Sequence, residues 1–257
     1  DENDFTVALT NGATLGGTVS QTNKVGTVYT YAYPVQAGDT EGDVQVQVVG
    51  TDDAGNGPTT MTEAAAFCID GTAPTLSNLL VTQNPCASSG TTVEFTFDVN
   101  EAGCGTFDDA DITVALNGVG VTAGNAVADG GNGSGSGTYT YTYVVEGGAA
   151  TGSVDITVDA TDDASNVATQ LTGTSFNVDA DAPTLANLNV TSATCLGGTM
   201  DLVFTVEASD VGCGTFNQDD ITVDITPNIA NEGTPTVTAA GNVYTYTFTI
   251  DNADADG

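Results

Sequence analysis

Two sets of acidic side chains have the residue types and the number that a calcium site needs. The first set is Asp70, Glu101, Asp108, Asp109, Asp162, Asp163 and Asn166, and the second is Asp179, Asp181, Glu207, Asp210, Asn217 and Asp219. Calcium takes about six to eight oxygen ligands from carboxylates, carbonyls and water. Carboxylates held close together repel unless they are protonated or bridged by a cation. If folding gathers each set, the sequence predicts calcium at two places. The competing interpretation is solvated acids in turns, where Asp and Asn are common.

The composition restricts what the chain can bind. It has 257 residues, 34 acidic side chains, no His and a single basic residue, Lys24, giving a net charge of −33. Such a chain has nothing to neutralise phosphates, which excludes nucleic acid as a partner. Its negative charge also excludes binding to anionic membrane surfaces. The charge fits either cation ligands or the solvated surface of a halophile's protein. Because the acids gather in turns rather than along strands, we favour cations.

Enzymatic chemistry is poorly supported. Without His there is no Ser-His or Cys-His relay, and a lysine-activated nucleophile has only Lys24 to use. Paired carboxylates can hydrolyse glycosides, but these acids recur along the chain, and recurrence fits a scaffold better than a single catalytic centre. We predict no enzyme.

An internal repeat sets the position of these residues. The segment Gly103–Phe107 recurs as Gly212–Phe216, an offset of 212 − 103 = 109, and Thr51–Asn56 returns as Thr161–Asn166. A unit of this size buries its own core. We predict three repeats, at 1–72, 73–181 and 182–257, the first lacking its opening strands and the last its closing ones. A window on a longer polymer explains both ends, and strands supplied by neighbouring copies are the alternative.

Alternation of apolar and polar residues predicts an all-β fold. In the middle repeat it marks strands over 76–83, 92–99, 111–116, 139–145, 154–160 and 168–178, with one short strand inside the loop 117–137. No helical period is visible. Seven short antiparallel strands in about 100 residues are typical of a β-sandwich. The expected architecture is a tandem array of such sandwiches in an extended rod.

The direction of successive strands predicts which loops meet. The loops 100–110 and 161–166 share one end of the middle repeat with the incoming linker, so each acidic set lies at a junction between repeats. Cys86 and Cys104 flank the strand 92–99 and stand about 30 Å apart, at about 3.3 Å per residue. A disulfide needs about 4.4–6.8 Å between Cα atoms, so these two do not pair.

The five cysteines suit disulfides better than zinc because His is absent. We predict a Cys86–Cys213 bond across the second junction, Cys68 as the local partner for Cys104, and Cys195 bonded towards a following repeat. Bonds between neighbouring chains and free buried thiols are the competing possibilities.

Three segments give the repeat a family resemblance. Asp70–Leu76 with Asp179–Leu185, Asp111–Val114 and Thr161–Asn166 together resemble the bacterial immunoglobulin-like (Big-type) tandem repeats of surface adhesins, stalks and surface-layer or filament proteins. The resemblance covers the whole chain. It implies an immunoglobulin-like fold and junctions made rigid by calcium, as in cadherins. The cysteines depart from the usual pattern, since most such repeats lack them.

Two further features concern the surface. Asn132-Gly133-Ser134 is a glycosylation sequon in a Gly-rich loop that we expect to be exposed. The tyrosine runs 29–33 and 139–143 are interpreted as cross-strand packing rather than a sugar-binding platform.

These observations predict a structural component of an extracellular or cell-surface filament, stalk or surface layer. Calcium and disulfides would make its repeat junctions rigid, and its partners would be copies of itself in a fibre or lattice. The main alternative is an adhesin whose repeats bind a receptor or glycan, and a passive spacer within a secreted enzyme is a third possibility. No run of about 18 apolar residues marks a membrane span.

Overall fold

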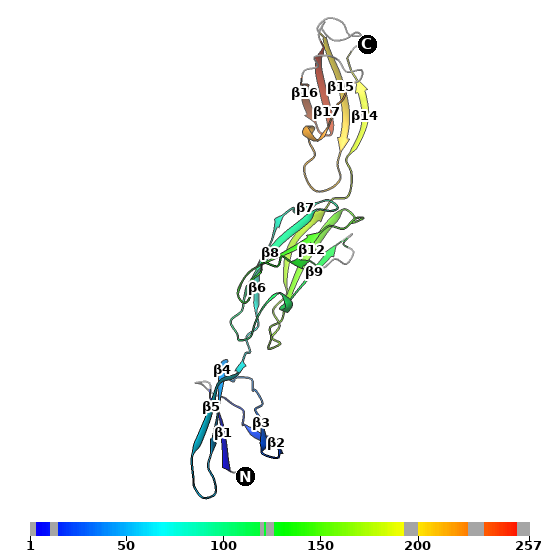
Figure 1. Cartoon of the computed structure of the whole chain (residues 1–257). Helices are drawn as coiled ribbons and strands as arrows, with labels where there is room; N and C mark the ends of the chain where they lie inside the picture. Colours follow the sequence, from blue (N-terminus) through cyan, green and yellow to red (C-terminus); the bar gives the residue numbers. More distant parts are fainter. Residues whose placement is uncertain are drawn as a thin grey trace.

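The chain folds into groups of β-strands that follow one another along an extended rod (Figure 1). The computed structural model describes residues 4–10, 15–118, 121, 126–192, 200–225 and 234–250. We name the groups the N-terminal, middle and C-terminal units, which hold β1–β5, β6–β13 and β14–β17. The strands are β1 (Phe5–Thr10), β2 (Ser20–Val25), β3 (Val28–Ala32), β4 (Gly42–Gly50), β5 (Thr59–Ile69), β6 (Thr75–Gln83), β7 (Cys86–Ala87), β8 (Thr92–Asn100), β9 (Ile112–Gly118), β10 (Val127–Ala128), β11 (Gly137–Val144), β12 (Gly152–Ala160), β13 (Leu171–Val178), β14 (Thr184–Val190), β15 (Met200–Ser209), β16 (Thr236–Ala240) and β17 (Val243–Ile250).

The middle unit is an immunoglobulin-like sandwich of two sheets. One sheet has the order β10–β11–β8–β6 and the other the order β7–β13–β12–β9. Alternation along β8 puts Phe95 and Phe97 on the inner face with no exposed surface, and alternation along β12 does the same for Val154, Ile156 and Val158. Side chains from the two inner faces form one core. The expected all-β sandwich is confirmed.

The tyrosine run of β11 belongs to this core. Tyr139 lies opposite Phe97 and Tyr141 opposite Phe95 in the antiparallel register. Their rings stack, with centroids 6.1 Å apart in both pairs. The interpretation of this run as cross-strand packing is confirmed, since Tyr139, Tyr141 and Tyr143 are all buried.

Short elements at the ends of the strands differ from the prediction. The segment 109–111, expected to lead into a strand, is a 3-10 helix whose N-cap is Asp108. Cys86 and Ala87 form β7, a two-residue strand parallel to β13, where the sequence predicted no strand. A two-residue strand is too short to leave any alternation in the sequence, so only the tertiary pairing reveals it.

The other two units each resemble one half of the middle sandwich. In the C-terminal unit the sheet β14–β15–β17–β16 pairs Phe204 with Tyr246, the counterpart of Phe95 with Tyr141 in the middle unit. In the N-terminal unit the sheet β1–β4–β5 pairs Val48 with Val7, the counterpart of Val158 with Val114. The hairpin β2–β3 packs beside that sheet through the rings of Tyr29 and Phe5, 5.0 Å apart. The internal repeat therefore extends to the register of the strands.

Candidate functional site

Two disulfides connect successive units of the rod. Cys68, at the end of β5, is bonded to Cys104 in the loop after β8, with 6.3 Å between Cα atoms. Cys86 of β7 is bonded to Cys213 in the loop after β15, with 5.5 Å between Cα atoms. These are the pairings that the strand directions predict. Cys195, the fifth cysteine, lies outside the described residues.

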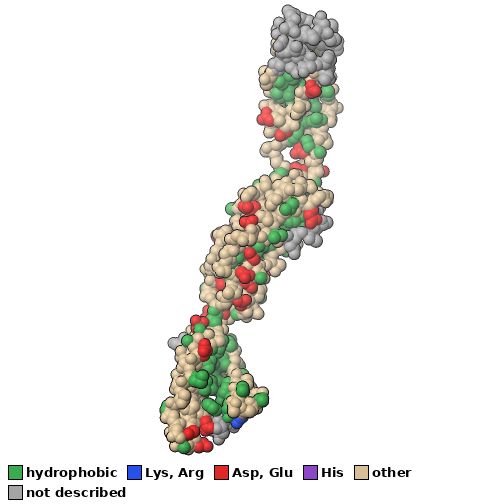
Figure 2. Space-filling view, in the orientation of Figure 1, with side chains coloured by type: hydrophobic (Ala, Val, Ile, Leu, Met, Phe, Trp, Pro, Cys, Tyr) green, Lys and Arg blue, Asp and Glu red, His purple; other side chains and the backbone are tan. Residues whose placement is uncertain are grey.

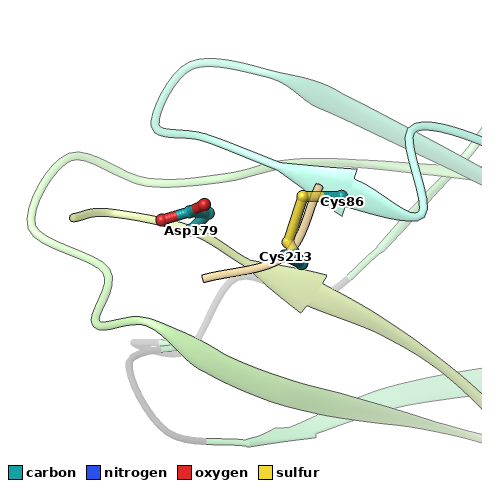
Figure 3. Close-up of side chains that lie close together, drawn as sticks. All are labelled: Cys86, Asp179 and Cys213. Carbon is teal, nitrogen blue, oxygen red and sulfur yellow. A yellow bond between two sulfur atoms is a disulfide. The ribbon is translucent and has the colours of Figure 1, made fainter. Parts of the chain in front are cut away.

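The second junction brings a carboxylate next to sulfur. Figure 3 shows Asp179 beside the Cys86–Cys213 bond, and an oxygen of Asp179 lies within 4.8 Å of both sulfurs. Metals bind cysteine as a thiolate, and both sulfurs here are already used in the disulfide. The group therefore serves as a covalent link between units and does not form a metal centre.

The first junction holds a cluster of three carboxylates, which we call the junction cluster: Asp70 from the linker, Glu101 from the end of β8 and Asp162 from the turn after β12. One oxygen of each lies within 4.8 Å of the other two. Asp162 is buried, with 7% of its surface exposed, while Asp70 and Glu101 are half-buried. The cluster lies where the linker enters the middle unit.

Backbone and amide donors hold each carboxylate in place. The backbone N–H and Nδ2 of Asn166 donate to the two oxygens of Asp162, at 2.8 and 2.9 Å. The backbone N–H of Cys104 donates to Asp70 at 3.0 Å, and that of Gly103 donates to Oε1 of Glu101 at 2.7 Å. Asn166 also donates to the carbonyl of Asp70 at 3.3 Å. The turn, the loop and the linker are thus joined around the three acids.

The geometry of the junction cluster fits a calcium ion. Calcium binds oxygen at about 2.3–2.6 Å, so two ligands of one ion are at most about 4.6–5.2 Å apart, which accommodates the 4.8 Å limit of the cluster. Oε2 of Glu101 is buried and makes no hydrogen bond. Two charges 4 Å apart repel by about 1 kcal/mol in bulk water and about 4 kcal/mol near a protein surface. A divalent cation among the three carboxylates would replace this repulsion with attraction.

Of the other predicted members of the first set, Asn166 joins the junction cluster through its hydrogen bonds, while Asp108, Asp109 and Asp163 accept hydrogen bonds from other groups. Asp108 caps the 3-10 helix by accepting from the backbone N–H of Ala110. Asp163 accepts from the backbone N–H of Thr106 at 2.8 Å and holds the loop after β8 against the turn. Loop carboxylates point towards the nearest backbone donors, and the sequence pattern does not reveal those directions.

Asp109 points away from the junction cluster and into the side of the sandwich. Its Oδ1 accepts from the hydroxyl of Tyr141 at 3.2 Å and from Nδ2 of Asn132 at 2.7 Å. Burial, followed by the charge of Asp109, raises the pKa of Tyr141 well above its usual range. Asp109 therefore supports the core.

The second predicted set is not assembled among the described residues. Glu207 accepts from Nδ2 of Asn187 on the neighbouring strand β14, and Asp210 accepts from the backbone N–H of Val211. Asn217 caps a second 3-10 helix, accepting from the backbone N–H of Asp219. The backbone N–H of Asp181 donates to Oδ1 of Asp179.

Asn132 differs from the exposed position expected for it. The residue is half-buried, and its Nδ2 donates both to Asp109 and, at 3.1 Å, to the carbonyl of Thr140. Its Oδ1 accepts from the backbone N–H of Thr140 at 2.7 Å. Nδ2 is the atom that a glycan would occupy, and here it fastens the Gly-rich loop to β11.

Two glycines leave room for the linker carboxylates at the junctions, and sequence reasoning did not assign them a role. A Cβ added at Gly103 would collide with the carboxylate of Asp70, and one at Gly212 would collide with that of Asp179. At both junctions the linker carboxylate packs on a residue that has no side chain. The signal was present in the repeated segments Gly103–Phe107 and Gly212–Phe216, where each glycine precedes the bonded cysteine.

Comparison with known proteins finds distant likeness to solved structures alone. No protein-family model and no curated protein matches the chain. A solved structure of FdeC, described as a broadly conserved Escherichia coli adhesin, has 18% sequence identity and a TM-score of 0.37, and the match covers 95% of this chain and 76% of that one. At this similarity no function can be transferred. None of the described segments is a helix long and apolar enough to cross a membrane.

Proposed function

We propose that this chain is a structural component of an extracellular filament, stalk or surface layer, in which covalent bonds and calcium fix the angle between successive sandwiches. The observation that carries the proposal is the pair of disulfides, one at each junction. A disulfide within one unit would stabilise only that unit and would not restrict movement at the junction. A disulfide between units adds a second covalent connection beside the linker and so restricts bending and rotation.

Hydrogen bonds at the linkers support the same function. At the first junction, Oγ1 of Thr72 donates to the carboxylate of Glu41 in the N-terminal unit, at 2.8 Å, while Asp70 is held by the middle unit. At the second junction, the backbone N–H of Ala180 donates to Thr151 of the middle unit at 2.9 Å. Each linker is therefore attached to the unit before it, which leaves little free chain between sandwiches.

The surface chemistry also favours a scaffold. Acidic side chains are spread over all the units, as Figure 2 shows on one face, and disulfides persist in oxidising environments such as the cell exterior. The acids of the first junction have structural hydrogen bonds rather than the arrangement of a catalytic pair, so we propose no enzymatic activity. The proposed partners are copies of the chain in a fibre or lattice.

Rigidity of the junctions is the property to test. Small-angle X-ray scattering of the oxidised chain with calcium should give the narrow distance distribution of a stiff rod. Reducing and alkylating the cysteines and chelating calcium should broaden it, because both junctions then bend. Electron micrographs of the same samples give the angle at each junction directly. An angle distribution that does not change between the two conditions would rule out the proposed function.

Calcium binding at the junction cluster is tested by stability. We expect calcium at about 100 times its Kd to raise the free energy of unfolding of the middle unit by about 2.7 kcal/mol. Glu101→Gln and Asp162→Asn should each lower calcium affinity about tenfold or more, because each removes a charged ligand. Without calcium, Glu101→Gln should not destabilise the unit, since it relieves repulsion among three acids.

The matched control is Asp155→Asn, which makes the same change of charge at an exposed position on β12 and should keep the full gain from calcium. Calorimetric unfolding with calcium or with a chelator measures both effects. If chelation leaves the melting temperature of the unmodified chain unchanged, the carboxylates are solvated turn acids and the cluster binds no calcium.

A further inference from the structure

A second glycosylation sequon lies in the C-terminal unit. Asn189-Val190-Thr191 spans the end of β14 and the residue after it, and it has the Asn-x-Ser/Thr pattern of a glycan acceptor. Asn189 is exposed. Its Nδ2, the atom to which a sugar is attached, donates no hydrogen bond to any residue that the structure describes. The amide of Asn187, in contrast, donates to Glu207, so Asn189 holds the available amide of this strand.

Asn189 lies on the outer face of β14, away from the core. Successive side chains of a strand point to opposite faces, and Leu188 and Val190, on either side of Asn189, line the groove between β14 and residues 221–225. The outer row continues across the neighbouring strands with short uncharged side chains, namely Thr205, Thr245 and Thr238. This row contains no large or charged side chain that would collide with a sugar on Asn189.

The middle unit shows that this face stays open when a second sheet is present. Asn189 pairs with Thr205 as Leu80 of β6 pairs with Thr96, so Leu80 is the counterpart of Asn189. Leu80 is 58% exposed in a sandwich that has both of its sheets, while the preceding residue, Leu79, packs against the core. The exposure of Asn189 therefore follows from the face on which it lies and does not depend on what covers the inner face.

The first sequon is in the opposite situation. Asn132 is half-buried, and its Nδ2 donates to Asp109 at 2.7 Å and to the carbonyl of Thr140 at 3.1 Å. N-glycosylation replaces one of the two hydrogens on Nδ2. A sugar would therefore break one of these bonds and separate the Gly-rich loop from β11. The folded middle unit excludes a glycan at Asn132.

We propose that Asn189 carries an N-linked oligosaccharide and that Asn132 carries none in the folded chain. The sugar donor is a lipid-linked oligosaccharide, and the catalyst is an oligosaccharyltransferase of the exporting cell. Nδ2 of Asn189 gives one proton to a base of the transferase and forms a bond to C1 of the first sugar. The bond between C1 and the lipid phosphate oxygen breaks, and its electron pair leaves with the phosphate. The proposal requires that the chain is exported, and it stands whether or not the chain builds a filament or binds calcium.

The attachment site in the folded chain tests the inference. The intact chain is secreted from cells that glycosylate Asn-x-Ser/Thr sequons, and the fraction with both disulfides formed is isolated. Peptide-N-glycosidase in heavy-oxygen water converts each glycosylated Asn into a labelled Asp, and mass spectrometry of peptides cleaved at acidic residues locates the label. We expect the label at Asn189 and none at Asn132.

The matched variants change the hydroxyl residue of each sequon. Thr191→Ala should remove one glycan from the intact mass, whereas Thr191→Ser, which preserves the sequon, should keep it. Ser134→Ala makes the equivalent change in the first sequon and should leave the glycan mass unchanged. Thr191 and Ser134 are both exposed, so these variants should keep their fold.

Three results would overturn the inference. The first is a label at Asn132 in the disulfide-bonded fraction, and the second is an unlabelled Asn189 in that fraction. The third is a glycan on Asn189 found only in chains whose disulfides have not formed, because the folded C-terminal unit would then exclude the sugar.

Discussion

Removing the Cys86–Cys213 disulfide should lengthen the fully stretched chain by about 300–330 Å. With both disulfides intact, the shortest covalent path from Cys68 to Cys213 runs along 86 − 68 = 18 residues and then through the Cys86–Cys213 bond. Without that bond, the shortest path crosses the Cys68–Cys104 bond and then 213 − 104 = 109 residues. The difference is 109 − 18 = 91 residues, at about 3.3–3.6 Å each.

The physical reason is that the disulfides divert tension around the strands β9 to β13 of the sandwich. The sequence separation of Cys86 and Cys213 is 127 residues, and the enclosed segment contains most of the middle unit. When the ends of the chain are pulled, force reaches Cys86 along β6 and, through the Cys68–Cys104 bond, along β8, and then crosses the Cys86–Cys213 bond to the C-terminal unit. The strands β9 to β13 lie outside both paths and carry none of it. These strands have no mechanical reason to separate.

Single-molecule stretching of the Cys86→Ser/Cys213→Ser chain measures the added contour length. The matched control is Cys68→Ser/Cys104→Ser, which removes the same number of cysteines. In the control the 18-residue path through Cys86 and Cys213 survives, so its contour length should equal that of the unmodified chain. Equal lengths for the two double variants would show that the chain does not carry force in this way.

Phe95→Ala should destabilise the middle unit by about 3–5 kcal/mol, the usual cost of removing a fully buried phenylalanine. The ring of Phe95 has no exposed surface, and the second sheet covers the face on which it lies. Its counterpart Phe204 is 7% exposed and lines a groove between β14 and residues 221–225. Phe204→Ala should lower the free energy of unfolding of the C-terminal unit by a smaller amount, because water and neighbouring side chains can enter the space that the ring leaves.

Hydrogen exchange measured separately in each unit distinguishes the two effects, since global unfolding mixes them. Val127→Ala is the control, because Val127 is 66% exposed and its truncation should change neither unit. If Phe95→Ala and Phe204→Ala lower the free energy of unfolding of their units equally, the difference in burial between the two phenylalanines does not determine stability.

Local and repeated features of the sequence determined the strands and the cysteine pairing. Strand alternation depends only on which residues point inwards, and β8 follows it from Val93 to Val99 without a break. The pairing of Cys86 with Cys213 follows from strand length and direction, because a strand of nine residues keeps its two ends far apart. The repeat applies the same reasoning at each junction.

Only the tertiary structure decided which acids meet. Asp70, Glu101 and Asp162 turn towards one point, while Asp109 turns to Asn132 and Asp163 to Thr106. A loop carboxylate turns to the donors within its reach, and those donors come from segments up to 57 residues away. The approach of Asp70 also requires the missing side chain of Gly103. Composition and periodicity contain no information about such contacts, because they depend on atoms that only the packed chain brings together.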